Sequence, residues 1–138
     1  MAMTGTAGWK RLLQQAKKAS TNAYAPYSRT RVGAAAIAAS GNVYTGCNIE
    51  NASFGMTACA ERVAIQNAVS AGERKIVAVA VFSPDIKSIM PCGACRQVMA
   101  EFGTPASPGL LIIVEGKKGP ETIPLVELLP RAFGAKSP

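Results

Sequence analysis

Three cysteines have the type and spacing of ligands for a metal ion. Cys92 and Cys95 are three residues apart at the expected start of a helix that follows Pro91, so both sulfurs can face the same helix end. Cys59 lies at the expected start of a second helix. Helix N-termini carry free N–H groups and a positive partial charge, which favour thiolate over thiol. If the two helix ends converge, the three sulfurs can hold one Zn²⁺ per chain and leave its fourth position open, as in catalytic sites.

Glu61 gives such a metal site a proton carrier. It lies two positions after Cys59, and at the first turn of a helix both side chains can reach the same place beyond the helix end. A carboxylate beside a metal-activated water acts as a general base. Three thiolates and one Zn²⁺ carry a net charge of about −1, which makes the metal less electrophilic. Arg62 and Arg96 are candidates to draw charge from the sulfurs.

The amino-acid composition excludes several classes of catalytic site. The 138-residue chain contains no histidine, which excludes Ser-His-Asp and Cys-His nucleophiles and histidine-ligated metals. Its formal charge of +7 comes from scattered lysines and arginines without interleaved aromatic residues, which favours a solvated basic face over a specific nucleic-acid surface. Without an evident secretory signal or membrane-spanning segment, the four cysteines are expected to be reduced, in a cytoplasmic protein with no membrane partner.

Two alternatives use the same cysteines differently. The Cys92-Gly93-Ala94-Cys95 segment alone is also typical of a thioredoxin-like redox pair at a helix start. A closed structural zinc site would recruit Cys47 as the fourth ligand, although a cysteine at a strand end is more often a small buried apolar residue. A basic structural-zinc module that binds RNA or protein is the alternative outside enzymes.

The hydrophobic pattern predicts one α/β domain over residues 1–138, with strands and helices alternating. Helices are expected at 9–19, ending before Pro26, at 57–71 and at 92–102. A β-hairpin is expected from 31–39 and 43–47, with buried strands at 76–82 and 110–115. Residues 48–56 and 103–109 are expected to be loops and 117–120 a turn, and 123–129 a closing strand or helix.

The motifs around the cysteines resemble those of the small homotetrameric cytidine deaminases. The resemblance covers nearly the whole chain, through CAER at 59–62, PCGACRQ at 91–97, YAPYS at 24–28, VGAA at 32–35, GCNIEN at 46–51 and LLPRAF at 128–133. The family implies a three-layer α-β-α sandwich around a mixed five-stranded sheet, assembled as a homotetramer with shared active sites. It implies zinc-dependent hydrolytic deamination of cytidine and 2′-deoxycytidine in pyrimidine salvage, with uridine or 2′-deoxyuridine and ammonia as products.

The same resemblance assigns roles to particular residues. Cys59, Cys92 and Cys95 are the zinc ligands, and Glu61 carries protons to ring N3 and to the departing amine. Asn48 and Glu50 bind the ribose hydroxyls, which suits their donor and acceptor groups. Phe54, Ala60 and Phe133 line the substrate pocket, with Phe133 contributed by a neighbouring subunit, and Arg62 lies behind the metal ligands.

One residue departs from the family pattern. The family usually has a phenylalanine that packs on the pyrimidine ring where this chain has Thr30. Loss of an aromatic face is expected to weaken base binding by about 1–3 kcal/mol if nothing replaces it. Thr30 therefore keeps open a related substrate, such as a modified or antibiotic aminopyrimidine nucleoside of the blasticidin type.

Overall fold

Five strands form one mixed sheet in the order β2-β1-β3-β4-β5 in the computed structural model, which describes residues 5–103 and 108–134. The strands are β1 (Gly33–Ala38), β2 (Val43–Cys47), β3 (Ile76–Phe82), β4 (Leu111–Gly116) and β5 (Gly119–Pro124). The helices are α1 (Gly5–Ser20), the 3₁₀ turn η1 (Phe54–Met56), α2 (Ala60–Ser70), α3 (Gly93–Phe102) and α4 (Leu125–Leu128). Only β3 and β4 run parallel, and the other neighbouring strands pair antiparallel.

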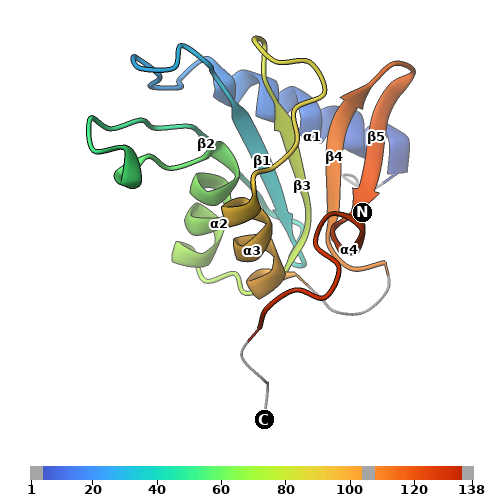
Figure 1. Cartoon of the computed structure of the whole chain (residues 1–138). Coiled ribbons are helices and arrows are strands. Elements are labelled where there is room, and N and C mark those ends of the chain that lie inside the picture. Colours follow the sequence, from blue (N-terminus) through green and yellow to red (C-terminus); the bar gives the residue numbers. More distant parts are fainter. Residues whose placement is uncertain (1–4, 104–107, 135–138) are drawn as a thin grey trace.

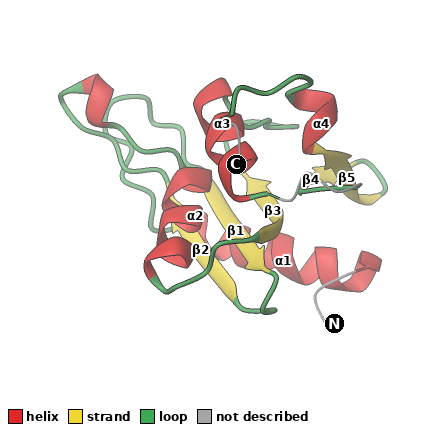
Figure 2. Ribbon diagram, turned by 90° about the horizontal axis from the view of Figure 1, so that it is seen from below, coloured by secondary structure: helices red, strands yellow, loops and turns green. Residues whose placement is uncertain are grey.

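Helices cover both faces of this sheet, as the family resemblance implies (Figures 1 and 2). Strand β1 consists of glycine, alanine and one isoleucine, all buried, and its side chains alternate between two apolar clusters. Ala34 and Ala36 face the cluster that contains residues of α2 and α3. Ala35 and Ile37 face the cluster that contains Leu12 and other residues of α1. Small side chains in this strand let the helices approach the sheet closely, and the three-layer sandwich is confirmed.

Several element boundaries differ from those predicted. Helix α1 begins at Gly5, earlier than expected, and ends at Ser20, well before Pro26. Helix α2 begins at Ala60 rather than at residue 57, because Ala58 forms an antiparallel bridge with Ile49 instead of entering the helix.

The C-terminal segment, for which the sequence predicts a strand or a helix, contains one of each. The turn after β4 is shorter than 117–120, and β5 already begins at Gly119. The segment predicted as strand or helix is divided between β5 and α4 at Pro124. Residues 104–107 of the expected loop 103–109 lie outside the described residues. None of the described helices combines the length and apolar character needed to span a membrane.

Candidate functional site

The three predicted cysteine ligands meet at the N-terminal ends of α2 and α3. Cys59 and Cys92 are the N-cap residues of these helices, both with extended backbone, and Cys95 is buried in the first turn of α3. The Sγ atoms are 3.7 Å apart between Cys59 and Cys92, and 3.3 Å apart between Cys92 and Cys95. All three lie within 4.8 Å of one another. A tetrahedral zinc with bonds of about 2.3 Å separates its sulfur ligands by about 3.8 Å, so the cluster fits the ion.

Cys47 does not join this cluster. It is the last residue of β2 and partly buried, with a thiol whose pKa is raised by burial. Among the described residues, the candidate metal-binding group contains only the other three cysteines. The structure therefore gives no support to a closed four-cysteine site.

Arg62, one of the two arginines predicted to draw charge from the sulfurs, contacts a cysteine of the cluster. Its Nη2 donates to the Cys59 Sγ at 3.4 Å and to the Thr57 carbonyl at 3.3 Å. A hydrogen bond from Cys95 and those from Arg62 and Cys92 lower the pKa of Cys59 to about 5 against the effect of burial. The bond with Cys59 is the main cause that raises the pKa of Cys95, and burial and the charge of Glu61 raise it further.

Arg96, the other candidate cation, does not contact the sulfurs through any hydrogen bond found. Its Nε donates to the Pro91 carbonyl at 2.8 Å, and its Nη1 donates to the Leu128 carbonyl at 2.9 Å. It thus fixes the loop before Cys92 against the end of α4. These hydrogen bonds do not support the prediction that Arg96 withdraws charge from the metal ligands; they indicate that it stabilises the loop before Cys92.

Glu61 is buried, with only 4% of its surface exposed. Burial is the main cause that raises the pKa of its carboxyl to about 7, and the nearby charge of Cys59 raises it further, whereas the charge of Arg62 opposes the rise. The charge of Glu61 in turn raises the pKa of Cys95, so the carboxyl and the sulfur cluster influence each other's protonation. A buried carboxyl that titrates near neutral pH is suited to accept and return a proton.

Asn48 and Glu50 lie on the segment that follows β2, and both are already engaged with the loop before β1. The buried Asn48 accepts from the Val32 N–H at 2.9 Å through Oδ1 and donates from Nδ2 to the Thr30 carbonyl at 2.7 Å. Glu50 Oε1 accepts the N–H groups of Tyr27 and Ser28 at 2.9 and 3.1 Å, and Oε2 accepts the Ser28 hydroxyl. The Ser28 hydroxyl is the main cause that lowers the pKa of Glu50, which keeps this carboxylate ionised.

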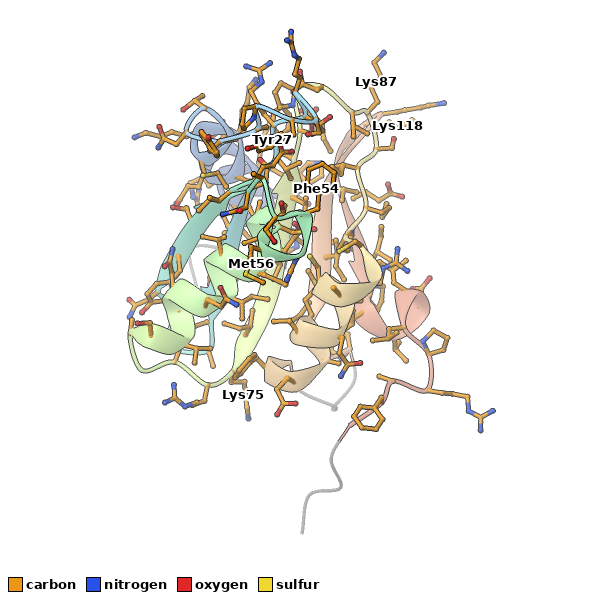
Figure 3. All side chains as sticks on the ribbon, turned by 60° about the vertical axis from the view of Figure 1, so that its left-hand side comes forward. Tyr27, Phe54, Met56, Lys75, Lys87 and Lys118 are labelled. Carbon is orange, nitrogen blue, oxygen red and sulfur yellow. The ribbon has the colours of Figure 1, made fainter. Side chains whose placement is uncertain are left out.

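The remaining predicted pocket residues divide into buried and exposed ones. Ala60 is fully buried at the first position of α2. Phe54 is 75% exposed, and its ring lies 5.9 Å from that of Tyr27 in an edge-to-face pair on the same side of the molecule as Met56 (Figure 3). Sequence reasoning did not single out Tyr27, although it lies within the YAPYS motif. Phe133 is 81% exposed, while its backbone carbonyl accepts from Gln97 Nε2 at 3.0 Å.

The segment that carries Phe133 runs away from the cysteine cluster. Figure 1 shows the chain after α4 running toward the C-terminal end of α3, whereas the cysteines lie at the N-terminal ends of α2 and α3. Thr30 is partly buried, and its Oγ1 and N–H contact the carbonyl and hydroxyl of Ser28.

Comparisons with known proteins agree with this geometry. A family model described as the cytidine and deoxycytidylate deaminase zinc-binding region matches residues 8–108. The chain is 46% identical over 124 residues to a cytidine deaminase of Sporosarcina psychrophila, covering 90% of both chains. It is similarly 46% identical over 125 residues to a cytidine deaminase of Halalkalibacterium halodurans, covering 91% of this chain and 93% of that one.

A solved structure shares the arrangement as well as the sequence. The crystal structure of cytidine deaminase from Burkholderia pseudomallei superposes with a TM-score of 0.79 at 43% identity, covering 89% of this chain and 97% of that one. The three-sulfur cluster also provides the ligands that a zinc-binding region requires. The chain therefore belongs to the family of zinc-binding cytidine and deoxycytidylate deaminases.

Proposed function

We propose that this chain catalyses the zinc-dependent hydrolytic deamination of cytidine and 2′-deoxycytidine to uridine and 2′-deoxyuridine, with release of ammonia. The observation that carries the proposal is a buried carboxyl, Glu61, beside three cysteine sulfurs at two convergent helix N-termini. Membership of the deaminase family and the activity named for relatives 46% identical to this chain support the same reaction.

The cysteines and Glu61 divide the chemistry between them. Cys59, Cys92 and Cys95 hold one zinc ion per chain, which supplies Lewis-acid activation of water when bound. Glu61 accepts a proton from the attacking water and delivers it to ring N3 of the pyrimidine. It then carries a second proton to the amino group that leaves from C4 as ammonia. Arg62 offsets part of the thiolate charge through its bond to Cys59.

Substrate recognition uses the segment after β2 together with the start of α2. Asn48 has one Nδ2 hydrogen left after its bond to Thr30, and the ionised Glu50 retains acceptor capacity, so both can bind ribose hydroxyls. Ala60 lines the base pocket, and Phe54 supplies an apolar wall beside it. These roles follow the family resemblance and the proximity of both segments to the ends of the helices that carry the cysteines.

The complete site is a shared one, in a cytoplasmic homotetramer built from single-domain subunits. Phe54 and Phe133 expose 75% and 81% of their surface, which is unusual for aromatic residues unless another surface covers them. The Phe133 segment runs away from the sulfur cluster of its own chain (Figure 1). We infer that Phe133 completes the pocket of a neighbouring subunit.

Glu61→Gln provides the decisive test of the reaction. The amide fills the same volume but does not carry the proton, so turnover of cytidine should fall by about 10²–10⁴-fold while zinc content stays at one per chain. The matched control is Glu101→Gln, on an exposed position of α3, which should leave turnover unchanged. The measurements are the ultraviolet absorbance change on deamination and zinc quantification. Full activity of Glu61→Gln would contradict the mechanism.

A related aminopyrimidine nucleoside is the second candidate substrate, and Thr30 is the observation that favours it. Its methyl and hydroxyl groups leave more room than the family's phenylalanine and remove a stacking face. The test compares cytidine, 2′-deoxycytidine and ring-modified or blasticidin-type nucleosides in the native protein and in Thr30→Phe. An unchanged ranking of substrates between the two proteins would reject a role for Thr30 in selectivity.

A further inference from the structure

Asp85 and Ser83 lie outside the cysteine and ribose motifs, at the start of the loop that joins β3 to α3. Asp85 Oδ2 accepts the backbone N–H of Arg31 at 2.8 Å. The Ser83 hydroxyl donates to the Arg31 carbonyl at 2.7 Å and accepts the N–H groups of Asp85 and Ile86, both at 3.1 Å. The turn at 83–86 therefore binds both backbone polar groups of one residue.

Asn48 binds the same two peptide groups from the other side. The peptide between Thr30 and Arg31 donates its N–H to Asp85 and offers its carbonyl to Asn48 Nδ2. The peptide between Arg31 and Val32 offers its carbonyl to Ser83 and donates its N–H to Asn48 Oδ1. Each peptide plane is rigid, so a bond on one side fixes the group presented on the other. The orientation of the Asn48 amide is thus tied to the 83–86 turn.

The burial and charge of these groups make the connection stiff. Asn48 and Ser83 are each only 8% exposed, so their polar atoms have few water molecules to replace a lost partner. Asp85 also pairs with the Arg31 guanidinium, through Nε at 3.1 Å and Nη2 at 3.0 Å. These bonds lower the pKa of Asp85 to about 2, so the acceptor stays ionised at any working pH.

We propose that Asp85, together with Ser83, is a positioning residue for Asn48: it fixes the two peptide groups that orient the Asn48 amide toward the ribose of the substrate. The inference rests on the proposed function, because it takes the ribose as the group that Asn48 binds. Asp85 itself touches no reacting atom. It acts by keeping the remaining Nδ2 hydrogen of Asn48 directed at a hydroxyl, which preserves the binding geometry of the sugar.

The test compares substrates with and without ribose hydroxyls. For Asp85→Ala, kcat/KM for cytidine should fall by about tenfold, mainly through KM, because Asn48 loses its fixed orientation. With 2′,3′-dideoxycytidine the loss should be less than about threefold, since this substrate has no ring hydroxyl for Asn48 to bind. Asp85→Asn keeps an oxygen acceptor for the Arg31 N–H and should recover most of the cytidine activity. A purely structural role would reduce the activity on both substrates equally.

Two controls separate this effect from loss of stability or charge. Glu73→Ala removes a carboxylate that accepts from Ser40, Asn42 and Tyr44 in another part of the chain, and should not alter the ratio of the two substrates. Arg31→Ala removes the ion pair but keeps the backbone N–H, and should likewise leave the ratio unchanged. An Arg31→Ala effect as large as that of Asp85→Ala would overturn the peptide-group mechanism.

The failure of this inference differs from failure of the proposed function. If the native protein does not deaminate cytidine, the proposed function is wrong. If Asn48→Ala selectively impairs cytidine over 2′,3′-dideoxycytidine and Asp85→Ala does not, the proposed function stands and the role of Asp85 is refuted.

Discussion

Gly46 of β2 lies directly against the backbone of α2, the helix that begins after Cys59 and carries Glu61. A Cβ at this position would lie 2.5 Å from the Ala64 nitrogen and 2.8 Å from the Ala60 carbonyl oxygen. Both are backbone atoms, so no side-chain rotation can relieve the contacts. Ordinary van der Waals contact begins at 3.4 Å, and α2 therefore has to move by about 0.9 Å in Gly46→Ala.

The displacement acts on the site because the moving segment includes a metal ligand. Cys59 and Glu61 shift with the start of α2, while Cys92 and Cys95 stay with α3. Overpacking of this size costs about 1–3 kcal/mol of unfolding free energy. A displacement near 1 Å in a catalytic site costs about 10²-fold in activity. We therefore expect Gly46→Ala to fold, with weakened zinc affinity and kcat/KM for cytidine reduced by about 10²-fold.

The assays are zinc competition with a chromophoric chelator, deamination kinetics and urea unfolding. The matched control is Gly116→Ala, in the β4–β5 hairpin, where a Cβ would lie 2.9 Å from the Gly119 carbonyl oxygen and no metal ligand is carried. It should lose a similar amount of stability but keep its zinc affinity. Native zinc affinity and activity in Gly46→Ala would refute the coupling of β2 to the site. Equal loss of zinc affinity in both variants would show that the lower stability alone explains the weaker zinc binding.

Three further predictions concern the metal and the charges around it. Chelation of zinc should abolish deamination but retain the far-ultraviolet helix signal, because the two apolar clusters on the sheet do not depend on the ion. Added zinc should restore turnover. Unfolding on chelation would instead indicate a structural metal. Arg62→Gln should retain zinc but lower kcat by about tenfold, as the Cys59 sulfur loses its cationic donor, and an unchanged kcat would exclude that role. The pKa of Asp85 is lowered from 3.8 to about 2, so its contribution to stability is present above pH 4 and is lost as the pH falls toward 2. Urea unfolding of zinc-free native protein and Asp85→Asn should therefore differ at neutral pH and converge near pH 2, whereas a constant difference would exclude the ion pair as its source.

The parts of the fold that the sequence predicts are those with a strong local signal. The apolar spacing in α1 and the valine-rich run in β3 are strong local signals, so the sequence predicts both elements with the correct type. The sequence also predicts that Cys59 and Cys92 lie near the starts of two helices, but it places both inside the helices at 57–71 and 92–102, whereas the structure has them as the N-cap residues. What the pattern could not show was which elements pair across the sheet.

Strand β5 illustrates that limit. It contains Pro120 and Pro124, which argue against a strand when the sequence is considered alone. The sequence instead predicts a turn at 117–120 and a strand or helix at 123–129. As an edge strand, β5 has one side free of ladder hydrogen bonds, where a missing N–H has no cost. Only the position of the strand in the sheet, a non-local property, makes these prolines acceptable.

The juxtaposition of Cys59 and Glu61 depends on a similar non-local contact. Within a continuous helix, residues two apart project about 200° from each other, and the sulfur and the carboxyl would face different sides. Here Cys59 remains outside the helix because Ala58 exchanges both backbone hydrogen bonds with Ile49, each at 2.9 Å. Had the helix begun at residue 57, as its sequence favours, Cys59 would have been turned away from Glu61. The bridge to Ile49 therefore creates the geometry of the site, and it belongs to the same segment that carries Asn48 and Glu50, so metal ligand and ribose-binding residues are aligned by one piece of backbone.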